Sequence, residues 1–468
     1  MGTIQGNSNE DRAISVFKGE RTHPLRKTLS FTVALLGLMT AVALSACDMI
    51  SNAQKYSGRL VVMGCDWGPA VTKAVVNVPE GLEKGQVLSP DMFSVKEKKK
   101  TGVFGDSSGR SVTDVYFSDN DGNRIDVNDE SSLNYITLEL YYSPEEGSPF
   151  FYSNSDGFNK WLESYSLEIK TLKGETVLLS GKQAVALDAV ISFENKPDKD
   201  TVFLPEVATT NTDGVFTGKD GNTFTYASYV PQNASESNRR PLVIWLHGAG
   251  EGGTDPLITL YGTKAVALMG DEFQSTMDGA YVLVPQTSTY WKRNENGDYF
   301  SDENGGDHSM FLYDLKEFID QYADSNYVDK DRIIIGGGSN GGFMALDLVI
   351  NYPEYFAAAY LVCEIYEPEL ISDDEINAIK DVPMWFVYAE NDKTVVPSKY
   401  EEPLIARLEN AGAKDIRKSV FSDVHDTSGK YFKDGEPYQY LGHFSWFYFF
   451  NNKCFDEGLS LWQWMSQQ

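Results

Sequence analysis

Two long stretches of the chain differ in how their apolar residues are spaced. Between residues 58 and 205 these residues form short β-branched or aromatic runs, separated by turn signals such as Asn120-Asp121-Gly122-Asn123. The runs cover residues 59–63, 74–78, 111–117, 135–142, 165–169 and 184–193. A pattern of short strands without helices predicts an antiparallel β-sandwich.

Beyond residue 216 strand-like and helix-like patterns alternate. The strand-like runs occupy residues 223–230, 241–247, 281–285, 357–362, 382–388 and 416–424, and a further run begins at Ile333. The helix-like segments cover residues 309–322, 343–352 and 401–411. This alternation predicts a mainly parallel, doubly wound sheet covered on both faces. Ligands bind beyond the carboxyl ends of the strands in such sheets, so we look for function directly after each strand.

The N-terminal segment has the features of a targeting signal. Arg26-Lys27 precede an apolar run over residues 31–44, which is too short to span a bilayer comfortably. The run ends in Leu44-Ser45-Ala46-Cys47, which resembles the lipobox of bacterial lipoproteins, in which the cysteine is acylated. The alternative is a plain secretory cleavage site before a cysteine. The resemblance implies a lipid anchor at Cys47 and an extracytoplasmic, membrane-anchored lipoprotein.

We therefore divide the chain into four parts. Residues 1–47 are predicted to be a leader with a lipoprotein signal, and residues 48–57 a tether. Residues 58–205 are predicted to form an immunoglobulin-like β-sandwich domain, and residues 206–468 a catalytic domain. The boundary lies near Pro205 because the residues on either side of it have the composition of a linker.

The charge of the chain restricts its partners. A formal net charge of −28 over 468 residues would repel nucleic acid. Four cysteines without a C-x-x-C pair indicate neither a disulfide framework nor a structural zinc site, and we expect no metal ion or cofactor. An acylated Cys47 would leave Cys65, Cys363 and Cys454, so at least one thiol should stay free.

The strongest chemical motif is a serine between glycines at the end of the run that starts at Ile333. Gly337, Ser339 and Gly341 stand in G-x-S-x-G register, directly before a helix-like segment. Such a sharp strand-to-helix turn lifts the serine hydroxyl above the sheet, where it can act as a nucleophile. The alternatives are a phosphate-binding loop or an ordinary turn, but no Gly-Lys-Ser/Thr follows and the spacing is not that of a dinucleotide fingerprint.

Two further strand ends supply the other parts that acyl transfer needs. The loop from His247 to Gly253 is rich in glycine, and the backbone N–H groups of Gly248 and Ala249 could form an oxyanion hole with that of Asn340. We expect His247 to brace this loop. Asp392 follows the strand-like run 382–388 and is the predicted acid of a triad, with Glu390 as the alternative.

Two histidines compete for the role of the base. His425 directly follows the last strand-like run, which is the shortest route to the site, whereas His443 follows a polar and aromatic insert. Geometry alone slightly favours His425, and the residues leave the choice open.

Together these motifs resemble α/β-hydrolases. The resemblance rests on the loop 247–253, the turn at Ser339, Asp392 followed by Val395-Val396-Pro397, and His443-x-x-Trp446. Within that superfamily the chain resembles the secreted bacterial esterases and polyhydroxybutyrate-depolymerase-like or prolyl-oligopeptidase-like hydrolases that carry an immunoglobulin-like N-terminal domain. The resemblance implies a serine carboxylesterase that uses Ser339, His443 and Asp392. A serine peptidase is the first alternative, and a catalytically vestigial carbohydrate-binding lipoprotein the second.

Residues after the other strands are candidates for substrate binding. Tyr290 and Trp291 follow the run 281–285, and Glu364 follows the run 357–362. The expected substrate is a small-molecule or polysaccharide-linked ester. Every predicted catalytic residue lies beyond Glu206, so a fragment that starts there should keep the serine chemistry.

Overall fold

A computed structural model describes residues 55–128, 133–294, 296–299 and 308–468. The described residues form one compact unit. The predicted signal segment and Cys47 lie outside the described residues. Within the described ranges, no helix is both long and apolar enough to cross a membrane.

The N-terminal half is built from strands, as its sequence pattern predicts. Its main sheet has the order β4-β3-β9-β12-β1-β2-β6-β5. The bounds are β1 Lys55–Cys65, β2 Gly68–Asn77, β3 Phe93–Thr101, β4 Phe104–Arg110, β5 Val112–Ser118, β6 Tyr135–Leu140, β9 Ser164–Thr171 and β12 Asp188–Glu194. β1 pairs with β12 in parallel at its start and with β2 in antiparallel along the rest. One strand therefore joins the two layers of the sandwich. It begins at Lys55, inside the predicted tether.

The C-terminal half contains the predicted, mainly parallel sheet. Its strand order is β14-β15-β17-β16-β18-β19-β20-β21. Only the β14–β15 and β15–β17 pairs are antiparallel. The bounds are β14 Asn211–Thr217, β15 Thr223–Tyr229, β16 Arg240–Leu246, β17 Tyr281–Gln286, β18 Val328–Gly338, β19 Ala358–Val362, β20 Met384–Ala389 and β21 Ile416–Phe421. β14 occupies residues whose composition predicts a linker.

Helices cover both faces of this sheet because its buried strands are apolar on both sides. Leu242, Ile244 and Leu246 of β16 pack into one hydrophobic cluster, together with four helices. These are α4 Leu312–Asp324, α5 Asn340–Asn351, α6 Asp373–Ile379 and α7 Glu401–Asn410. Val243 and Trp245 face a second cluster with α2 Pro256–Gly262, α3 Asp271–Thr276, α8 Trp446–Phe450 and α9 Leu461–Ser466.

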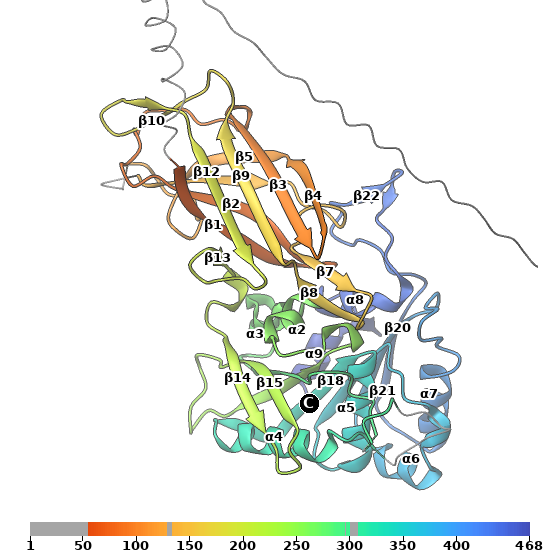
Figure 1. The fold of residues 1–468 in the computed structure, drawn as a ribbon. Coiled ribbons are helices and arrows are strands. Elements are labelled where there is room, and N and C mark those ends of the chain that lie inside the picture. Colours follow the sequence, from red (N-terminus) through yellow and green to blue (C-terminus); the bar gives the residue numbers. More distant parts are fainter. Residues whose placement is uncertain (1–54, 129–132, 295, 300–307) are drawn as a thin grey trace, which may run out of the picture. The chain divides into compact units, whose positions relative to one another are not determined.

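The second cluster does not end at the catalytic half. It continues without a break into the interior of the sandwich, where it includes Leu60, Val71 and Ile191. α2 makes the connection, since it contacts β1 and β2 on one side and β15 and β17 on the other (Figure 1). The sandwich and the catalytic sheet thus share one hydrophobic core.

Three cysteines lie in the described part of the chain. Cys65, Cys363 and Cys454 are all buried and all unpaired. Burial is the main cause that raises the pKa of each thiol, in the case of Cys65 to about 12.

Candidate active site

Ser339 sits at the turn between β18 and α5 with a strained backbone. Its φ is 54° and its ψ is −114°, which is rare for a residue with a side chain. Its amide donates to Val362 O at 2.8 Å, which ties the turn to β19. The flanking glycines are required sterically, since a Cβ on Gly341 would lie 1.9 Å from Leu246 O and one on Gly337 2.4 Å from Gly341 C. The G-x-S-x-G pattern therefore reflects close contact between helix and strands.

Asp392 and His443 are joined by a hydrogen bond. His443 Nδ1 lies 2.7 Å from Asp392 Oδ2, and the aspartate is 3% exposed. Asp392 Oδ1 accepts from the amides of Thr394 and Val395 at 2.7 and 3.0 Å, which fixes the carboxylate. With Nδ1 donating to Asp392, the Nε2 atom of His443 is left as the acceptor of a proton. His443 and Ser339 line the same cavity.

His425 has different partners. Its Nδ1 atom lies 2.6 Å from Asp423 Oδ1 and 3.3 Å from the Tyr448 hydroxyl, and its side chain is 38% exposed. It is not among the residues that line the cavity around Ser339. The structure thus places His443, and not His425, in the cavity that Ser339 lines.

The glycine-rich loop after β16 also borders this cavity. Gly248 and Ala249 line it, and the Ala249 and Asn340 amides have no acceptor among the described residues. His247 is fully buried, lies with Nδ1 2.7 Å from Gly248 O and accepts from the Thr287 amide through Nε2 at 3.2 Å. Burial lowers the pKa of His247 to about 4, so it stays neutral and braces the loop.

Glu251, in the same loop, is a cavity residue that the sequence analysis did not single out. It is 6% exposed, and its Oε1 accepts from Asn159 Nδ2 at 2.8 Å. Burial raises its pKa to about 7, while the Asn159 side chain and the Gly248 amide oppose that shift. The Gly248 amide is therefore engaged with this carboxyl group. The signal in the sequence that could have indicated this residue is an acidic side chain among the four glycines of the loop 247–253.

The cavity measures about 530 Å³ and is shared between distant segments. Aromatic residues of the His443 loop and α8 form one wall, and Asp66, Trp67, Tyr152 and Asn159 of the sandwich half contribute another. No local pattern could have indicated the second wall, because these residues reach the serine only through tertiary packing.

The three predicted substrate-binding residues do not line this cavity. Trp291 is fully buried and donates from Nε1 to His247 O at 3.1 Å. Glu364 is fully buried behind α5, and burial raises its pKa to about 8. Tyr290 donates its hydroxyl to Asp156 O at 3.1 Å. Trp291 and Tyr290 therefore join neighbouring segments, whereas Glu364 Oε2 accepts from the nearby Tyr366 amide at 2.6 Å. Among the described residues, no group of three or more acidic, histidine or cysteine side chains could hold a metal ion.

Comparisons with known proteins agree with this architecture. Residues 57–178 match the esterase Ig-like N-terminal domain, and residues 302–379, which include Ser339, match the prolyl oligopeptidase family. The fold is that of α/β-hydrolases, preceded by an immunoglobulin-like half, which confirms the predicted fold class, and the prolyl oligopeptidase match indicates a serine hydrolase.

Among solved structures, a thermostable esterase is similar over most of both chains. It shares 23% identity, with 86% of this chain and 97% of that chain covered and a TM-score of 0.67. A ferulic acid esterase covers 46% of this chain and 91% of its own at 16% identity and a TM-score of 0.36. An S-formylglutathione hydrolase from Agrobacterium tumefaciens covers 56% and 98% at 16% identity, also with a TM-score of 0.36. A search of curated protein sequences returned no match.

Proposed function

We propose that the protein is a serine carboxylesterase that uses Ser339, His443 and Asp392. The observation that carries the proposal is the Asp392–His443 hydrogen bond beside a strained serine in one cavity. Asp392 holds the imidazole in the tautomer that presents Nε2, and it stabilises the imidazolium that forms when the base takes a proton.

The proposed reaction has two halves. Ser339 Oγ attacks the ester carbonyl carbon while its proton passes to His443 Nε2, and the carbonyl oxygen takes up the negative charge. The N–H groups of Ala249 and Asn340 stabilise this oxyanion. His443 then protonates the leaving alcohol, and an acyl-enzyme remains. Water, deprotonated by His443, attacks the acyl carbon and releases the acid and the free serine.

The two family matches favour different leaving groups. The esterase Ig-like match over residues 57–178 supports an alcohol, and the prolyl oligopeptidase match over residues 302–379 supports an amine. We favour the ester because the sandwich half itself lines the cavity. A serine peptidase remains the second candidate.

Labelling with a fluorophosphonate tests the nucleophile directly. The wild-type chain should react and should hydrolyse p-nitrophenyl acetate, whereas Ser339→Ala should do neither. Loss of a triad member costs on the order of 10⁴-fold or more in turnover. Near-normal turnover by a folded Ser339→Ala variant would refute the proposal, and turnover of dipeptide amides above that of esters would favour the peptidase.

We also propose that Cys47 carries a lipid that anchors the enzyme outside the cytoplasm of a bacterium. The support is the Leu44-Ser45-Ala46-Cys47 sequence after an apolar run. In a bacterial host the wild-type chain should sediment with membranes, and Cys47→Ala should block processing or release the protein. Equal partitioning of both forms would count against the anchor.

A further inference from the structure

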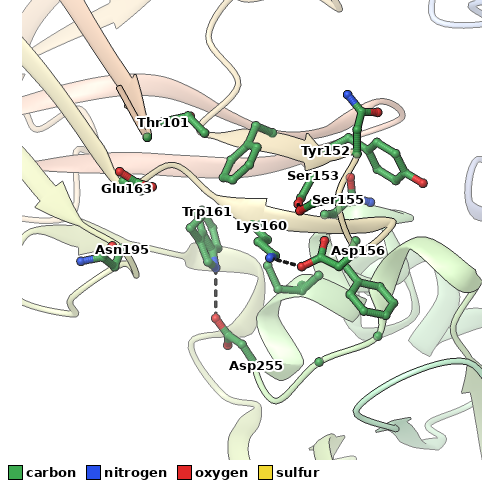
Figure 2. Close-up of a pocket in the computed structure, with 18 of the residues that line it drawn as sticks. Thr101, Tyr152, Ser153, Ser155, Asp156, Lys160, Trp161, Glu163, Asn195 and Asp255 are labelled. Carbon is green, nitrogen blue, oxygen red and sulfur yellow. Dashed lines mark hydrogen bonds and ion pairs between the residues drawn. The ribbon is translucent and has the colours of Figure 1, made fainter. Parts of the chain in front are cut away.

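A second hollow opens next to the catalytic cavity. This groove, of about 940 Å³, is bounded by the turn between β3 and β4, by the hairpin of β7 (Phe150–Ser153) and β8 (Phe158–Trp161), and by residues 252–258 (Figure 2). Tyr152 and Asn159 line both hollows. The groove and the cavity around Ser339 therefore adjoin each other at these two residues.

Aromatic side chains in the groove are unusually open to solvent. Phe104 is 80% exposed and Tyr152 is 56% exposed, and Val103 beside Phe104 is 92% exposed. Apolar groups gathered on one open surface indicate a binding site. Flat aromatic rings suit ligands with C–H faces, such as pyranose rings, because ring and sugar can stack.

The charged groups of the groove are already engaged. Lys160 forms an ion pair with Asp156, and Trp161 Nε1 donates to Asp255 at 3.1 Å (Figure 2). Lys196 lies 3.2 Å from the other oxygen of Asp255. The groove therefore offers no free cation among the described residues, and the net charge of −28 further disfavours an anionic ligand.

The remaining polar groups favour hydroxyl groups as partners. The side chains of Asn154, Glu163 and Asn195 line the groove and make no hydrogen bond within the described part of the chain. Amide and carboxylate groups both accept hydrogen bonds from hydroxyls. A fatty acyl chain would leave these groups unpaired and would itself stay largely in water in so open a groove.

We propose that this groove binds a neutral oligosaccharide and that an esterified sugar unit of the same ligand enters the catalytic cavity past Tyr152 and Asn159. The binding step is independent of the esterase function proposed above, and only the cleavage of the bound ligand rests on it. The immunoglobulin-like half then selects the substrate on which the catalytic half acts.

The binding step can be measured without turnover. Calorimetric titration of the full chain carrying Ser339→Ala with xylotetraose, cellotetraose, mannotetraose and maltotetraose should show binding of at least one of them. Adding Phe104→Ala should weaken that binding about tenfold, which corresponds to the loss of one stacking contact. Phe455→Ala is the matched control, because Phe455 is 51% exposed and lines none of these hollows. It should leave binding unchanged.

The outcomes separate the two proposals. If none of the four sugars binds, or if Phe104→Ala binds as well as Phe455→Ala while both unfold at the parental temperature, the groove is not a sugar site. Binding of dodecanoate instead, with the same dependence on Phe104, would also overturn the proposal. If a sugar binds as expected but Ser339→Ala still hydrolyses p-nitrophenyl acetate, the esterase proposal fails and the sugar site stands.

Discussion

His443 and Asp392 illustrate how one hydrogen bond separates two candidate bases. His443 Nδ1 is bonded to the buried carboxylate of Asp392. His425 Nδ1 is bonded to the carboxylate of Asp423, which is partly exposed to solvent. We expect His443→Ala to reduce the acylation rate of p-nitrophenyl acetate about as much as Ser339→Ala, since triad members act as a unit. His425→Ala should stay within about tenfold of wild type, because it removes no group from the cavity. Single-turnover kinetics of both variants will measure the two acylation rates. If His425→Ala loses far more activity than His443→Ala, His425 is the base.

Glu251 predicts a pH dependence that the triad alone would not give. Its pKa of about 7 means that it gains a negative charge as the pH rises through neutrality, close to the proposed oxyanion site. A negative charge there disfavours a second negative charge, so ionisation should slow the reaction above pH 7. Glu251→Gln keeps the shape but cannot ionise.

The kcat/KM of Glu251→Gln, divided by that of the wild type at the same pH, should therefore rise between pH 6 and pH 9. Asp255→Asn provides the control, since Asp255 lies in the same segment but does not line the catalytic cavity. A ratio for Glu251→Gln that stays flat across this range would show that the carboxyl group does not titrate there or does not influence the transition state.

The turns that carry the proposed catalytic residues could be predicted from the sequence, because the signal for each turn lies within a few adjacent residues. Glycines at fixed positions, as around Ser339, reveal where the backbone must approach a neighbour closely. The residues that the sequence did not indicate are those whose role depends on distant partners, such as Asn159 on Glu251. Its position after a strand predicts Trp291 to be a substrate contact, but aromatic character does not reveal that this side chain is buried.

The missed elements have their own physical reasons. β3 contains Lys96-Glu97-Lys98-Lys99-Lys100, whose charges hide the alternation of the strand, although Glu97 points inward to a buried ion pair with Arg110. α8 is aromatic at every position from Trp446 to Phe450 and is buried all round, so it lacks the period of a surface helix. The residues of β14 have the composition of a linker because strands at a sheet edge need few apolar residues.

Two loops meet at Gly442 and set the distance between acid and base. A Cβ at this position would lie 2.1 Å from Asn391 Oδ1 and 2.9 Å from Asn391 C, so Gly442→Ala must push the two loops apart. The Asp392–His443 bond should lengthen, and kcat should fall about 100-fold, as expected for a displacement of roughly 1 Å.

The Gly442→Ala variant should unfold within a few degrees of wild type, because the strain is confined to the surface of the catalytic half. Gly458→Ala serves as a control, since its Cβ would meet nothing within 4 Å. Gly458 has a φ of 82°, so the control also measures what backbone strain alone costs. Equal activity of the two variants would show that the fit of Gly442 against Asn391 has no effect on catalysis.

The shared core changes the expectation that the catalytic half can work alone. A fragment that starts at Glu206 would expose the apolar side of α2, lose the cavity residues Trp67 and Asn159, and lose the hydrogen bond from the Gly64 amide to Glu206. We therefore expect it to aggregate or to unfold well below the full chain, and to lose at least about tenfold in kcat/KM.

Thermal unfolding and p-nitrophenyl acetate hydrolysis of the fragment will test this expectation. The full chain should unfold in a single transition, since one core links both halves. A monomeric, folded fragment with full activity would show that the two halves are independent domains.

The three buried thiols can be used as probes of local unfolding. Cys65 lies in β1, Cys363 follows β19, and Cys454 lies near the C-terminus. A buried thiol with a raised pKa carries almost no thiolate, so alkylating reagents should modify these positions only when the surrounding segment opens. Mass spectrometry of alkylated peptides would therefore show which region gives way first. In an oxidising medium the three cysteines would also stay reduced, provided that the chain folds and buries them before two thiols can form a disulfide.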